Sequence, residues 1–172
     1  GNSSYNSLIK ILTPNTNYCV KAYAKNSVGV GYGNQVCFTT LAPEPIITTV
    51  TPNGQNSIPF GNVVVNNISA VKSYTLSASA LNPATGSITI SAPSGFQVST
   101  NAASGFSSSL NITYTSATIT PTTIYVRFVP TLFGDYNGVI THTGGSATPI
   151  NIDDVTVTGK GIQDPSLLSN TG

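Results

Sequence analysis

The sequence predicts an all-β protein, in which an antiparallel β-sandwich is preceded by a second, partial sandwich. Short runs of alternating apolar and polar residues are separated by turn residues at roughly 8 to 12 positions, and no stretch has a helical period. Ser, Thr and Asn account for 62 of the 172 residues, while 39% are hydrophobic and the formal net charge is +1. Low net charge and frequent β-branched residues indicate a chain that buries a core.

The composition also limits the possible partners. With only six Lys and Arg residues, the chain has no basic patch that could release many phosphate counterions, so we expect no nucleic acid partner. Apolar runs such as 63–65 are far shorter than the roughly 20 residues of a membrane-spanning helix, so we expect no membrane insertion. The chain opens at Gly1 without a signal-peptide pattern, which favours a segment processed or excised from a longer protein.

The first unit contains a hairpin pattern. Residues 16–24 and 34–40 each alternate with a period of two, and a Gly-rich connector lies between them. If the hairpin is symmetric about Val28, Cys19 lies opposite Cys37 at about the separation that a disulfide needs. The even cysteine count fits either a disulfide or two buried thiols.

The same region resembles the second half of a fibronectin type III domain. The resemblance is carried by LTPNTNY at 12–18, AYAKNSVG at 22–29 and FTT at 38–40. It implies that Tyr18 is the corner tyrosine, whose hydroxyl ties back to the backbone. It also implies that residues 1–41 hold only the last three of about seven strands.

The prolines of residues 42–45 predict a stiff linker. Residues 46–162 then predict one sandwich of seven or more strands, and 163–172 a linker to a further segment. The alternation predicts an inward-facing set consisting of Phe60, Val63 or Val65, Leu76, Ile88, Ile90, Phe96, Val98, Leu110, Ile112, Ile124, Val126, Phe128, Tyr136 and Ile140.

This second unit resembles an immunoglobulin-like repeat of the Hydin type. The matching stretches are IPFGNVVV at 58–65, APSGFQVS at 92–99, YVRFVPT at 125–131 with GDYNG at 134–138, and VTGKG at 157–161. Such repeats occur with fibronectin type III modules in large secreted or surface proteins of Bacteroidota. The resemblance implies a spacer or interaction role and supplies no catalytic motif.

Asp153 and Asp154 interrupt the last apolar run. Ile150 and Ile152 share one parity, whereas the valines that follow share the other, so we expect a β-bulge here. Two adjacent carboxylates are also weak candidates for a calcium site, although calcium needs six to eight oxygen ligands.

The sequence offers little for catalysis, and we expect no enzyme activity and no cofactor. His142 is the only histidine, and no Gly-x-Ser-x-Gly motif presents a nucleophile. We interpret His142 as a partly buried strand residue near a rim. An active site would have to combine it with a carboxylate such as Asp135.

Four tyrosines are candidate ligand-binding aromatics: Tyr23, Tyr32, Tyr114 and Tyr125. On outward faces they could serve as platforms for a sugar ring or a partner loop, but outward tyrosines also pack across strands without binding anything. The longest loop, 100–109, contains Phe106, which we interpret as a core plug.

The sequence therefore predicts a non-catalytic spacer or adhesive module of a larger secreted or cell-surface protein. Its expected partners are a protein or polysaccharide at the cell surface and the neighbouring domains of the same polypeptide. The alternative function is a carbohydrate-binding module that accompanies a polysaccharide-degrading enzyme.

Overall fold

A computed structural model describes residues 6–147 and 151–164. The prediction of an all-β protein is confirmed: the described residues form strands, and none of them belongs to a helix that could span a membrane. The strands are β1 (Asn17–Lys25), β2 (Val30–Thr39), β3 (Ile46–Val50), β4 (Ser57–Val64), β5 (Lys72–Ser79), β6 (Gly86–Ser91), β7 (Phe96–Ser99), β8 (Ser109–Tyr114), β9 (Ile119–Phe128), β10 (Gly134–Thr143) and β11 (Val155–Ile162).

The chain divides into two compact units between Pro43 and Glu44. This division falls inside the stretch 42–45, where the prolines predict a linker. Among the described residues, the first unit contains one antiparallel pair, β1 with β2. Its connection is closed by Asn26, whose side-chain oxygen accepts hydrogen bonds from the backbone N–H groups of Val28 and Gly29.

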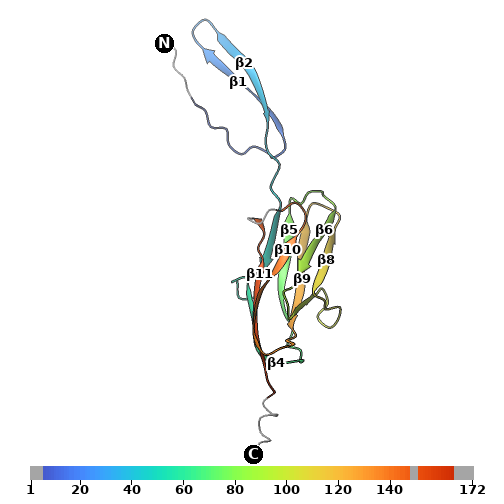
Figure 1. Cartoon of the computed structure of the whole chain (residues 1–172). Coiled ribbons are helices and arrows are strands. Elements are labelled where there is room, and N and C mark those ends of the chain that lie inside the picture. The colour runs from blue at the N-terminus through green and yellow to red at the C-terminus, as the bar shows by residue number, and fades with distance from the viewer. Residues whose placement is uncertain (1–5, 148–150, 165–172) are drawn as a thin grey trace, which may run out of the picture. The chain divides into compact units, whose positions relative to one another are not determined.

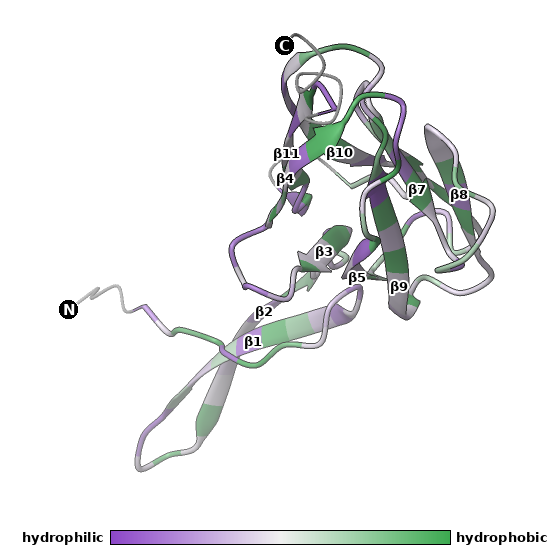
Figure 2. Cartoon of the chain, turned by 90° about the horizontal axis from the view of Figure 1, so that it is seen from below, coloured by the Kyte–Doolittle hydropathy of each residue, from purple (hydrophilic) through white to green (hydrophobic). Residues whose placement is uncertain are grey.

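The second unit is a sandwich of two sheets (Figure 1). The five-stranded sheet has the order β4-β11-β10-β6-β8, and the four-stranded sheet has the order β3-β5-β9-β7. Along β9, hydrophobic and hydrophilic residues alternate in visible bands (Figure 2). Ile124, Val126 and Phe128 face the core with no exposed surface, so Tyr125 and Arg127 lie on the outward face of the four-stranded sheet.

One strand pairing differs from the antiparallel prediction. The strands β4 and β11 pair in parallel, and their register shifts where Thr158 lies opposite Pro59 and Lys160 opposite Asn62. Gly61 has a φ of 68° at this shift, and glycine adopts that conformation without the steric cost that a Cβ imposes.

The bulge predicted at Asp153 and Asp154 is wrong, because the chain changes sheets there. Ile152 bridges to Ile47 of the four-stranded sheet, and the Asp153 N–H donates to the Ile47 carbonyl at 3.0 Å. Two residues later Val155 begins β11 in the five-stranded sheet. Because the two sheets face the core from opposite sides, the parity of the inward residues changes. Ile150 lies outside the described residues.

The chain enters and leaves this sandwich at opposite ends (Figure 1). Ile47, near the start of β3, lies beside Ile152. From Ile152 the chain continues into the eight residues of β11, which end at Ile162. This strand is about 23 Å long at roughly 3.3 Å per residue.

Most of the predicted inward set is buried. Phe60, Val63, Leu110, Ile112 and Tyr136 are partly buried and pack against the core. The prediction omitted nine other buried residues: Ile47, Ile58, Tyr74, Ala78, Leu81, Tyr114, Ile119, Val155 and Val157.

Candidate functional site

A polar cluster that reaches into the core links Tyr74, His142 and Asp154. The Tyr74 hydroxyl lies 2.8 Å from Nε2 of His142, and Nδ1 of His142 lies 3.1 Å from Oδ1 of Asp154. The same carboxylate oxygen accepts the backbone N–H of His142 at 3.0 Å. Tyr74 and His142 are 2% and 1% exposed, whereas the Asp154 side chain is 37% exposed. The cluster therefore runs from β5 through the buried ring of His142 to a carboxylate at the surface.

The donors in this cluster follow from its chemistry. An ionised Asp154 carboxylate only accepts hydrogen bonds, so Nδ1 of His142 carries the proton and Nε2 accepts from Tyr74. Burial, helped by the negative charge of Asp154, raises the pKa of Tyr74, so its hydroxyl remains a donor. Burial also lowers the pKa of His142, although the hydrogen bond and charge of Asp154 oppose this shift.

This cluster resembles the constellation of a hydrolase only in its residue types. Both ring nitrogens of His142 are engaged within the protein, and the ring is buried where no substrate reaches it. A base that activates a nucleophile needs a free nitrogen beside that nucleophile. His142 lies next to the end of β10 but is fully buried and not partly buried, and it pairs with Asp154 instead of Asp135.

The remaining carboxylates do not converge on a metal site. Asp135 lies 3.8 Å from Lys160 on the surface, and Asp154 is engaged by His142. The backbone carbonyl of Asp153 accepts the hydroxyl of Thr49 at 2.9 Å. Within residues 6–147 and 151–164, no group of three His, Cys, Asp or Glu side chains is placed to hold a metal ion.

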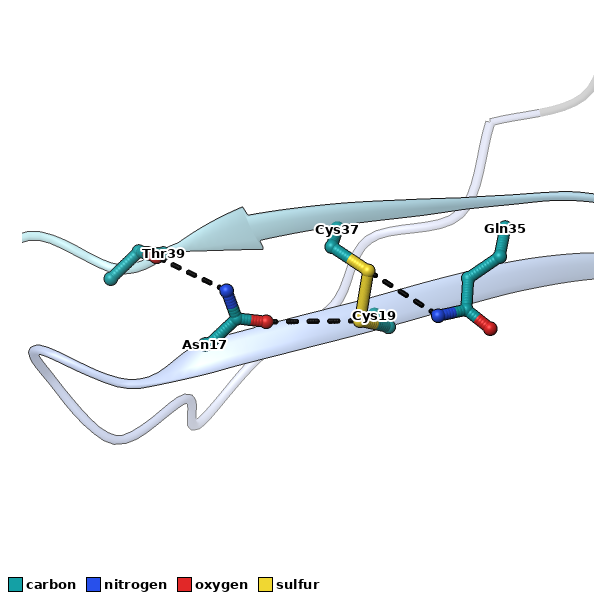
Figure 3. The surroundings of a disulfide bond; sticks show 5 residues. All are labelled: Asn17, Cys19, Gln35, Cys37 and Thr39. Carbon is teal, nitrogen blue, oxygen red and sulfur yellow. Dashed lines mark hydrogen bonds between the residues drawn. A yellow bond between two sulfur atoms is a disulfide. The ribbon is translucent and has the colours of Figure 1, made fainter.

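The two cysteines are bonded across the hairpin (Figure 3). Their register places Cys19 directly opposite Cys37, and the two sulfur atoms are 2.10 Å apart. The side chains of Asn17 and Gln35 lie on either side of the bond and contact its sulfurs. The symmetric hairpin predicted from the sequence thus brings the cysteines together.

The four candidate tyrosines are divided between the two units and differ in their exposure. Tyr23 and Tyr32 are 67% and 66% exposed on the hairpin, with ring centroids 6.2 Å apart. Tyr114 is only 6% exposed, so the prediction that it faces outward is wrong. It has the parity of Leu110 and Ile112, which pack against the core, and its hydroxyl end lies against Gly86, where no Cβ intervenes.

Tyr125 is half-buried on the outward face of the four-stranded sheet, beside a cluster that the sequence did not reveal. Arg127 lies two positions after Tyr125 on β9, and its Nε donates a hydrogen bond to Oε1 of Gln97 at 2.8 Å. Its guanidinium carbon lies 4.4 Å from the ring centroid of Phe106. Phe106 therefore covers an arginine on the sheet surface and is not a core plug.

Comparisons with known proteins give matches among solved structures alone. No protein-family model matches the chain, and no curated protein matches its sequence. Among solved structures 51 chains match, including the ASH/PapD-like domain of human CEP192 (PapD-like domain 7). That match has 12% sequence identity and a TM-score of 0.37, and covers 69% of this chain and 86% of that chain.

Proposed function

We propose that the chain is a non-catalytic spacer segment of a larger secreted or cell-surface protein. The observation that carries the proposal is the opposite placement of the ends of the second unit: the chain enters beside Ile152 and leaves beyond Ile162. A module with this arrangement adds its own length to a chain of modules, whereas a module with adjacent ends adds little.

Two further features support this role. The disulfide of the hairpin suits an oxidising compartment outside the cytosol. Tyr74 and His142 join the two sheets, and both side chains are buried away from any substrate. We assign the chain's titratable core residues to holding the fold together.

We also propose that the first unit is the C-terminal part of a fibronectin type III domain and the second a Hydin-type immunoglobulin-like repeat. In the first unit the Tyr18 hydroxyl accepts the Thr13 backbone N–H at 2.8 Å, which is the contact expected of a corner tyrosine. Adhesion through a surface partner would add to the spacer role without changing its geometry.

A distance measurement tests the spacer. Spin labels are placed at Glu44→Cys and Gln163→Cys, two exposed positions that flank the second unit, with the native disulfide kept intact. We expect one narrow distance distribution centred above about 20 Å, because β11 alone spans that length. The same labelled chain in denaturant is the control and gives a broad distribution. A broad distribution in buffer, or a short distance, would refute the spacer.

A further inference from the structure

We propose that Arg127 and Tyr125 form a binding site for an acidic polysaccharide whose sugars carry carboxylates. The site lies on the outward face of β9. It adds a binding activity to the proposed spacer and is independent of it, because the end-to-end distance of the second unit does not involve these side chains.

The first argument is the unusual set of partners of Arg127. The side chain is half-buried, yet within the described residues no carboxylate lies within ion-pair distance of it. Its contacts are neutral: the amide oxygen of Gln97 and the ring of Phe106. The two terminal amino groups have no hydrogen-bond partner among the described residues, so a planar pair of donors is available to a carboxylate.

The second argument is that the guanidinium is held in place before any ligand arrives. Gln97 lies directly across from Arg127 in the register of β7 and β9. The loop that carries Phe106 is fixed at its start by the hydrogen bond from Ser99 Oγ to the Ser104 carbonyl at 2.6 Å. At its end, Val98 and Ser107 exchange two backbone hydrogen bonds. Fixed donors lose little conformational freedom on binding.

The third argument selects a sugar over other carboxylates. Tyr125 shares the face of Arg127, and its hydroxyl has no hydrogen-bond partner among the described residues. Its ring has no aromatic neighbour within them. Its cross-strand neighbour on β5 is Ser73, and Thr123 and Thr75 follow on the same face. A planar ring among hydroxyls suits a pyranose, and Arg127 beside it suits the carboxylate of a uronic acid.

A hollow borders Gln97, the hydrogen-bond partner of Arg127, and gives room for a polymer. It has a volume of about 430 Å³, and its lining includes Gln97, Ser94, Ser108 and Thr131. Gln97 thus contacts both the guanidinium and the hollow. A neighbouring sugar of the same chain would find further hydroxyl and amide groups there.

Affinity electrophoresis of the full chain tests the site. The probe is polygalacturonate, and the matched neutral probe is its methyl-esterified form, which keeps the sugar backbone and loses the charge. Poly-glutamate serves as the peptide probe. We expect retardation by polygalacturonate alone. Arg127→Gln should weaken it roughly ten- to hundredfold, as for the loss of a charge-assisted pair, and Arg127→Lys should weaken it less.

Three further variants separate this site from general charge attraction. Lys160→Gln removes the same charge from another sheet and should leave retardation unchanged. Tyr125→Ala should weaken retardation by polygalacturonate. Tyr125→Phe should keep the thermal midpoint of the parent chain. No retardation by polygalacturonate, equal retardation by poly-glutamate or the ester, or equal losses in Arg127→Gln and Lys160→Gln would each overturn the proposal.

Discussion

The Tyr74 hydroxyl donates a hydrogen bond to Nε2 of His142 at 2.8 Å, and this bond joins the two sheets of the sandwich. Tyr74 belongs to β5 of the four-stranded sheet and His142 to β10 of the five-stranded sheet. Asp154 holds the other ring nitrogen and lies at the point where the chain changes sheets. The three residues fix the relative position of the sheets around a polar centre.

Removing the Tyr74 hydroxyl tests this centre. Tyr74→Phe leaves Nε2 of His142 buried without a partner, which costs about 1–3 kcal/mol of unfolding free energy. Tyr125→Phe is the matched control, because that hydroxyl has no partner to lose among the described residues. Equal stability of the two variants in urea unfolding would contradict the role assigned to Tyr74.

The lowered pKa of His142 predicts a loss of stability in mild acid. Burial is the main cause of the shift, so the unfolded chain, with the ordinary value of 6.5, binds the proton more readily than the folded chain. The contribution of neutral His142 to the free energy of unfolding is fully present above pH 6.5 and is lost as the pH falls below it. Thermal midpoints should therefore decrease from about pH 7 to 5, with a shallower slope in His142→Gln. A slope that this substitution leaves unchanged would contradict the assignment.

Gly95 is predicted to tolerate no side chain. Its φ is 84°, and a Cβ there would lie 2.6 Å from the ring of Tyr136. Gly95→Ala should therefore cost about 1–3 kcal/mol for overpacking, beyond the conformational cost. Gly54→Ala separates the two effects, because Gly54 has a φ of 67° and open space around it. Chemical denaturation should show Gly95→Ala as the less stable; the opposite order would refute the contact.

The disulfide is predicted to stabilise the hairpin and leave the sandwich unaffected. It closes a separation of 18 residues, and a loop of that size is worth about 3 kcal/mol. A two-stranded hairpin alone is marginally stable in water. Changing both cysteines to Ser should accelerate amide hydrogen exchange in β1 and β2, while exchange in β5 and β9 keeps its rate. Unchanged protection of the hairpin would contradict this.

The sequence predicted the fold class and most of the core because a period of two determines which side chains a strand buries. The strand residues Ile88, Ile90, Val126 and Phe128 illustrate this. Periodicity does not reveal where a strand changes sheets, so the parity change at Asp153 was interpreted as a bulge. The outward prediction for Tyr114 overlooked the parity that it shares with Ile112.

The side-chain clusters were not predictable, because they join residues far apart in sequence. Tyr74 and His142 are 68 positions apart, and Arg127 and Gln97 are 30 apart. The pattern of inward residues does indicate Tyr74, which shares the parity of Leu76. Its polar partner depends on the register of three strands, and the sequence alone does not define that register.

The central claim is that the sandwich is a spacer with its ends at opposite poles. Pulling the full chain through its termini with an optical trap tests this claim most directly. The force then enters the second unit at β3 and leaves it at β11. These strands belong to different sheets, so both sheets are loaded together. The account predicts that the second unit unfolds in a single step, with a length gain of up to about 3.5 Å for each residue released. Gradual extension at low force, without a discrete step, would contradict it.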